Sequence, residues 1–94
     1  MVILRIEHRV PNYEGWKRAF DSDPVDRKGS GVRRYQIMRG VDDPNDVIID
    51  LEFNTKSEAE ALLNAMRHVW ARVEGSVMWN PQAWIVEVAE SHEL

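Results

Sequence analysis

The spacing between apolar residues differs from segment to segment along this chain, and the order of these segments restricts the fold more than any other feature of the sequence. Residues 2–9 and 46–53 alternate between apolar and polar side chains, which is typical of strands that bury one face. Between Ala59 and Val73, apolar side chains instead recur every three or four positions, as on the buried face of a helix. The two spacings together predict a helix layer packed on a sheet.

Three further segments complete the order. An aromatic stripe from Tyr13 to Phe20 has helical spacing, and Asn12 before it is suited to cap a helix. Residues 32–39 and 82–89 are expected to be strands. Neither face of 32–39 is cleanly apolar, which predicts a strand at an edge of the sheet.

The resulting order is β-α-β-β-α-β. Because each crossover should be right-handed, both helices are expected to cover one face of an antiparallel sheet ordered 4-1-3-2. This is an α+β, ferredoxin-like architecture in one domain over residues 1–94. The longer helix can begin at either of two capping boxes, Thr55 with Glu58 or Ser57 with Glu60.

Composition narrows the function classes. A chain of 94 residues without cysteine has neither disulfides nor thiolate metal sites to supplement a small core, so we expect burial against a second subunit. A net charge of −4 without a dense basic block argues against nucleic acid as a partner. The sequence shows no signal peptide and no apolar run long enough to span a membrane, so we expect a cytoplasmic protein.

The predicted topology leaves one face of the sheet without helices. Charged side chains on adjacent strands would meet on that face, with Arg5, Glu7 and Arg9 beside Asp50 and Glu52. One interpretation is a solvated surface with ion pairs. The other is a homodimer interface through this sheet face, to which four apolar side chains contribute: Ile3, Tyr35, Ile37 and Ile48.

Three motifs carry a resemblance to a known superfamily. They are Tyr13-Glu14-Gly15-Trp16-Lys17, Asp42-Asp43-Pro44-Asn45 and Glu52-Phe53-Asn54-Thr55-Lys56-Ser57-Glu58-Ala59. Together with the element order, they make the chain similar to the dimeric α/β-barrel superfamily, which contains antibiotic biosynthesis monooxygenase-like domains, small polyketide cyclases and heme-degrading monooxygenases. The resemblance implies a homodimer whose two sheets form a barrel, with a pocket between sheet and helices in each subunit.

The resemblance also implies a function. It favours a cofactor-independent monooxygenase or cyclase that acts on an aromatic or polyketide-like small molecule. Heme-degrading members share only a histidine near the position of His68, so no cofactor is expected. The alternative is a non-catalytic small-molecule-binding or assembly module, since no complete catalytic set is visible in the sequence.

Six residues are candidates for the site. His8, His68 and Tyr35 are candidate proton carriers, although histidines in such positions are more often packing or surface residues. Trp16, Trp70 and Trp79 are candidates for binding an aromatic substrate. Trp16 and Trp70 also fit the core by their spacing, whereas Trp79 lies in a predicted loop that could gate a pocket or contact a second subunit. No histidine pair has metal-ligand spacing.

A basic cluster lies between the first predicted helix and the second predicted strand. Its members are Arg27, Lys28, Arg33 and Arg34. The cluster could hold an anion, or it could be a solvated loop.

Overall fold

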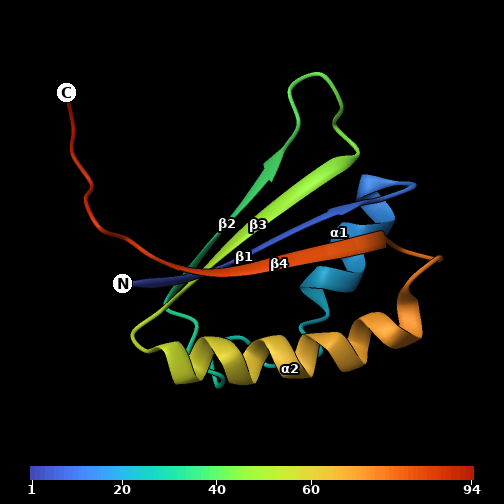
Figure 1. The fold of residues 1–94 in the computed structure, drawn as a ribbon. Coiled ribbons are helices and arrows are strands. Elements are labelled where there is room, and N and C mark those ends of the chain that lie inside the picture. The colour runs from blue at the N-terminus through green and yellow to red at the C-terminus, as the bar shows by residue number, and fades with distance from the viewer.

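The computed structural model describes residues 1–94, and its elements follow the predicted order (Figure 1). The elements are β1 (Val2–Arg9), α1 (Tyr13–Asp21), β2 (Arg34–Arg39), β3 (Asp46–Phe53), α2 (Lys56–Val73) and β4 (Trp79–Glu87). All paired strands are antiparallel, and the sheet has the order β2-β3-β1-β4. This is the predicted ferredoxin-like arrangement. Both helices lie on the same side of the sheet (Figure 1).

The core forms where the apolar faces of β1 and β3 meet the helices. Leu4 and Ile6 on β1 pair with Leu51 and Ile49 on β3, and all four are buried. Strand alternation places every second side chain on this face, so one register satisfies both strands. Burying each of these side chains stabilises the fold by roughly 1.5–3 kcal/mol at most.

Helix α2 begins at the first of the two predicted capping boxes. The Thr55 Oγ1 accepts a hydrogen bond from the Glu58 backbone N–H at 3.2 Å, and the Glu58 carboxylate accepts one from the Thr55 N–H at 3.2 Å. Ser57 is instead an exposed residue in the first turn of the helix. From this start, Leu62 and Trp70 fall on the buried face of α2.

Helix α1 packs on the sheet through long side chains. No Cα atom of α1 lies within 8 Å of a Cα atom in any strand or in α2. Trp16 and Phe20 fill the gap and are both buried. Two arginines stack on the same helix, with Arg39 lying 3.9 Å from the Tyr13 ring centre and Arg27 lying 3.9 Å from the Phe20 ring centre. Large aromatic side chains therefore hold α1 at a distance from the sheet.

Two strand predictions need correction. β2 begins at Arg34, and its register opposes Tyr35 to Leu51 and Ile37 to Ile49. Opposed residues of paired strands point to the same side, so Tyr35 and Ile37 lie on the helix-covered face and not on the predicted interface. The mixed polarity of this edge strand made its two faces hard to tell apart.

β4 is the other strand that differs from prediction. It spans Trp79–Glu87 and therefore includes Trp79, which was expected in a loop. Pro81 did not delay the start of the strand because a bulge lies there: Gln82 pairs with Glu7, while Trp79 pairs with Arg9. Proline at a bulge needs no ladder hydrogen bond from its nitrogen.

The sheet face without helices combines charge pairs with apolar side chains. Arg5 donates two hydrogen bonds to the Asp50 carboxylate, both at 2.7 Å, across neighbouring strands. Trp84 and Val86 on β4 oppose Arg5 and Ile3 on β1, and both remain about half exposed. This face is therefore partly apolar in a single chain.

Neither helix is both long and apolar enough to cross a bilayer.

Candidate functional site

An apolar cavity lies between the sheet and the two helices. Its volume is about 60 Å³, and its wall is formed by residues from β1, β3, both helices and the segments that follow each helix. The lining residues are Ile6, His8, Trp16, Ala19, Phe20, Pro24, Arg27, Ile49, Met66, Val69, Trp70, Val73, Val77 and Met78. Only His8 and Arg27 bring polar side chains to this wall. The cavity therefore suits an apolar group with one or two directed polar contacts.

His8 is the buried polar residue of the cavity. Its exposed fraction is 3%, and its Nδ1 atom has no hydrogen-bond partner. Burial lowers the pKa of His8 to about 4, because the charged imidazolium is poorly solvated there. The ring is consequently neutral at pH 7. A buried nitrogen without a partner costs about 1–3 kcal/mol, which a ligand with a matching polar group would recover.

The position of His8 coincides with an irregularity in the sheet. Between the pairs Glu7–Gln82 and Arg9–Trp79, β4 has one residue more than β1, so the bulge lies opposite His8. Asn80 adopts a left-handed backbone conformation with φ of 55°, which asparagine accepts more readily than most residues. The bulge interrupts regular pairing beside the imidazole.

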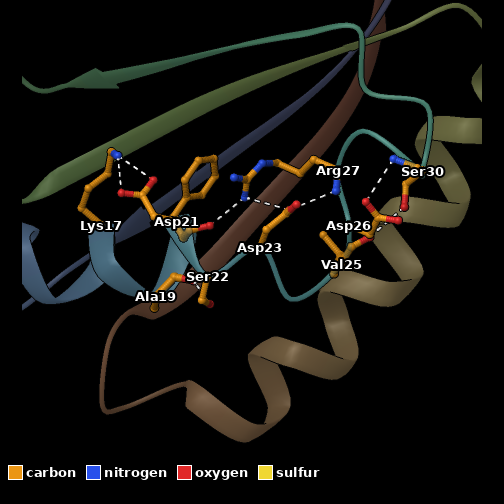
Figure 2. Close-up of polar contacts among 11 residues, drawn as sticks. Lys17, Ala19, Asp21, Ser22, Asp23, Val25, Asp26, Arg27 and Ser30 are labelled. Atoms are coloured by element: carbon orange, nitrogen blue, oxygen red, sulfur yellow. Dashed lines mark hydrogen bonds and ion pairs between the residues drawn. The ribbon is translucent and has the colours of Figure 1, made fainter.

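Arg27 forms another part of the cavity wall, from the loop between α1 and β2 (Figure 2). Its Nη1 atom donates a hydrogen bond to the backbone oxygen of Phe20 at 2.7 Å and lies 3.4 Å from the Asp23 carboxylate. The same carboxylate accepts a hydrogen bond from the Arg27 backbone N–H at 2.9 Å. Asp23 has a left-handed backbone conformation with a φ of 55°, and the Arg27 side chain lies over the Phe20 ring of α1.

An open groove lies on the other side of Arg27. Its volume is about 640 Å³, and it is lined by Asp23, Arg27, Lys28, Val32, Arg33, Arg34 and Tyr35. The structure therefore brings the predicted basic cluster together in one groove. Arg27 lines both this groove and the apolar cavity.

Three of the six predicted site residues meet in the cavity. His8 and Trp16 contact each other edge-to-face, and Trp70 lines the opposite part of the wall on α2. The two tryptophans also belong to the core, as their spacing predicted, and their part in substrate binding stays a prediction. Nothing in the spacing identified Arg27 as a wall residue, because its position depends on the turn at Asp23.

The other three predicted site residues lie elsewhere. Tyr35 lines the groove and packs against Phe20 with ring centroids 5.3 Å apart. His68 is exposed on α2, where its Nδ1 atom lies 2.8 Å from the backbone oxygen of Asn64. Trp79 is partly exposed at the start of β4 and does not line the cavity. No group of three or more potential metal-ligating side chains is present.

Comparisons with solved structures identify proteins of the same fold. The cofactor-independent oxygenase SnoaB from Streptomyces nogalater is 12% identical, with a TM-score of 0.74 over 96% of this chain and 94% of that one. MhuD from Mycobacterium tuberculosis, a heme-degrader with two hemes bound in its active site, is 16% identical, with a TM-score of 0.69 over 99% and 100%. A dimeric ferredoxin-like protein from an uncultured marine organism is 11% identical, with a TM-score of 0.67 over 97% of each chain.

Other solved structures of this fold are assigned as antibiotic biosynthesis monooxygenases. No protein-family model matches the sequence, and neither does any curated protein. At these identities the likeness confirms the fold that the three sequence motifs indicated. Proteins of this fold have more than one function, so the activity has to be argued from the cavity.

Proposed function

We propose that this chain is a small-molecule enzyme of the cofactor-independent oxygenase or cyclase type, which binds an aromatic substrate in the cavity between sheet and helices. The observation that carries the proposal is the unpaired Nδ1 of the buried His8, in a wall that is apolar apart from His8 and Arg27. Trp16 and Trp70 supply flat aromatic surfaces in the same wall. A mostly apolar cavity with a few directed polar groups can orient a polarised aromatic ring. The likeness in fold to an oxygenase supports the same class.

Anthrone illustrates the oxygenase reaction in balanced steps. Neutral His8 takes one proton from the methylene carbon, and the resulting carbanion combines with dioxygen to form a peroxide anion. The imidazolium returns its proton to that peroxide. Loss of the second methylene hydrogen with cleavage of the O–O bond then forms the new carbonyl and releases water. The carbon is oxidised and dioxygen is reduced, and His8 ends the cycle neutral.

The environment of His8 affects the first step in two opposing ways. A pKa of about 4 makes the free imidazole a weaker base than an exposed histidine. An enolate formed beside it in a dry cavity would raise the pKa of His8, because the opposite charge stabilises the imidazolium. Proton transfer is therefore favoured only when a substrate that forms a stabilised anion occupies the cavity.

The size of the cavity requires adjustment on binding. About 60 Å³ is far below the roughly 300–1,000 Å³ of typical ligand sites. Since α1 reaches the sheet through aromatic side chains, rotation of those side chains can widen the site without moving the backbone.

The test is oxygen uptake and anthraquinone formation from anthrone by the purified protein without added metal or cofactor. We expect His8→Ala to lose at least about tenfold in rate, whereas the exposed His68→Ala variant should keep the rate of the unmodified protein. Equal rates for His8→Ala and the unmodified protein would remove His8 from the mechanism. No reaction with anthrone, despite its binding, would favour the alternative below.

One observation favours a non-catalytic binding module instead. The low pKa of His8 suits a neutral hydrogen-bonding partner better than a strong base. On this alternative, Nδ1 orients a bound aromatic ligand and no proton is transferred. Binding with an unchanged ligand recovered after incubation would support it.

We also propose that two chains form a homodimer through the sheet face without helices. Trp84, Val86, Ile48 and Ile3 give this face a partly apolar surface, on which the Arg5–Asp50 pair could fix the register. Exposed apolar patches of this kind are typical of interaction sites. A dimeric protein of the same fold supports this assembly.

A further inference from the structure

We infer that the site takes an aromatic carboxylate, with its ring system in the cavity and its carboxylate in the basic groove on the far side of Arg27. This inference rests on the proposed function, since it names the class of molecule that the cavity would bind. Its basis is the pair of compartments that share one arginine.

Three side chains in mutual contact, Phe20, Arg27 and Tyr35, lie where the two compartments adjoin. The Arg27 guanidinium lies 3.9 Å from the ring centre of Phe20, which lines the cavity, and 5.2 Å from that of Tyr35, which lines the groove. The Arg27 side chain is 12% exposed, so protein covers most of it. A molecule that occupied both compartments would contact all three side chains.

Arg27 retains donors for such a molecule. Only its Nη1 atom is engaged, by the backbone oxygen of Phe20 and the Asp23 carboxylate. A guanidinium carries N–H donors on three nitrogens. Since the hydrogen bond and the ion pair of Arg27 both involve Nη1, its Nε and Nη2 donors have no protein acceptor. Arginine is suited to a carboxylate because its planar fork matches both oxygens.

The charge of the groove favours an anion over a neutral group. Lys28 and Arg33 have no carboxylate within ion-pair distance, and Arg34 pairs with Glu52. Asp23 is the sole acid that lines the groove, and it already contacts Arg27. This excess of cations occurs on a chain with a net charge of −4, so it reflects local placement. A local positive field attracts anionic ligands in particular.

The volumes of the two compartments also favour a ligand that occupies both. The cavity holds only about 60 Å³ before it widens on binding, so a carboxylate attached to the ring system would lie outside it, in the neighbouring groove of about 640 Å³. A ligand that spans Arg27 places its apolar part on apolar residues and its charge near water and cations. A neutral aromatic molecule would leave the free cations of the groove unused.

The test is isothermal titration calorimetry of the whole protein with 2-naphthoate and with its neutral counterpart 2-naphthamide. We expect naphthoate to bind at least about tenfold more tightly at low salt, and the advantage to shrink at high salt because exposed charges are screened. The Lys28→Gln/Arg33→Gln double variant keeps Arg27, so it should reduce that advantage at least about threefold while its affinity for naphthamide stays the same. Both side chains are exposed, so the variant should fold. Arg67→Gln, an exposed cation on α2, serves as the matched control.

The outcomes separate this inference from the proposed function. Equal affinities for naphthoate and naphthamide would overturn the carboxylate inference and leave the cavity proposal intact. An advantage for naphthoate that is undiminished in the Lys28→Gln/Arg33→Gln variant would also overturn it, because the exposed cations of the groove would then not attract the carboxylate. Absence of binding by either probe would overturn both, since the cavity would not accept an aromatic ring.

Discussion

The imidazole of His8 meets the indole of Trp16 edge-to-face, with ring centroids 5.4 Å apart and planes inclined by 60°. The two residues come from β1 and α1, and both rings line the cavity. Trp16 covers the histidine from the helix side, and the sheet encloses it from the other. The contact thus places a titratable ring where water cannot solvate its charged form.

This burial predicts a pH dependence of stability. The pKa of His8 falls from an ordinary 6.5 to about 4 in the folded chain, so between these values the unfolded state binds more protons. The free energy of unfolding should therefore decrease as pH falls from 6.5 to 4, by roughly 3 kcal/mol in total from this residue. Urea unfolding at several pH values in this range measures the effect.

A His8→Gln variant isolates the contribution of this histidine. Glu7 opposes the trend, since its hydrogen bond with Asp46 raises its pKa, and Asp43 acts at lower pH, since its hydrogen bond with Arg9 lowers its pKa. Both remain in the variant, so the difference between the two proteins reports His8 alone. An identical pH dependence in both proteins would show that the ring is not held neutral by burial.

The two possible capping boxes of α2 predict contrasting effects of two similar substitutions. Thr55→Ala removes a side chain that accepts a hydrogen bond from the Glu58 N–H, so it should lower the free energy of unfolding by about 1 kcal/mol. Ser57→Ala should leave stability unchanged or slightly raised, because alanine is the better helix former at an exposed position. Chemical denaturation of both variants measures the contrast. A larger loss for Ser57→Ala would contradict the observed cap.

The elements that the sequence predicted well are those with a strong local period. β1 and β3 match their expected bounds of 2–9 and 46–53, because strict alternation specifies both the strand and its buried face. β2 was the weak case, since arginines on both faces left its orientation to be decided by pairing with β3. Periodicity carries no information on such long-range register.

The site was only partly accessible to sequence reasoning for a similar reason. His8 could be placed on the apolar face of its strand, but its missing hydrogen bond depends on what the helices bring against it. Arg27 lies in a polar loop, and only the turn at Asp23 places it on the cavity wall. Because of the bulge at Asn80, β4 begins at Trp79, which the sequence placed in a loop. These features arise from tertiary packing and backbone geometry.

The partly apolar sheet face predicts that one charge can separate the proposed homodimer. Trp84 is 47% exposed in the middle of the edge strand β4, and Trp84→Glu would place a carboxylate where two apolar surfaces should meet. We expect this variant to be monomeric by light scattering at concentrations where the unmodified protein is a dimer. Val41→Glu, at a 98% exposed position in the β2–β3 turn, should remain a dimer. A monomeric unmodified protein would contradict the proposed assembly.

The bulge opposite His8 predicts that position 80 accepts glycine more readily than a β-branched residue. Asn80 has a φ of 55°, a conformation that glycine and asparagine tolerate but that costs most other residues about 1–2 kcal/mol. Asn80→Gly should therefore change the free energy of unfolding little, while Asn80→Val should lower it by about 1–2 kcal/mol, because a β-branched side chain is least compatible with positive φ. Denaturant unfolding of the two variants gives this comparison. If the bulge also fixes the position of His8, Asn80→Val should shift the NMR signals of the imidazole and Asn80→Gly should not. Equal stability of the two variants would mean that residue 80 is not held at a positive φ, and that the bulge does not constrain the backbone beside His8.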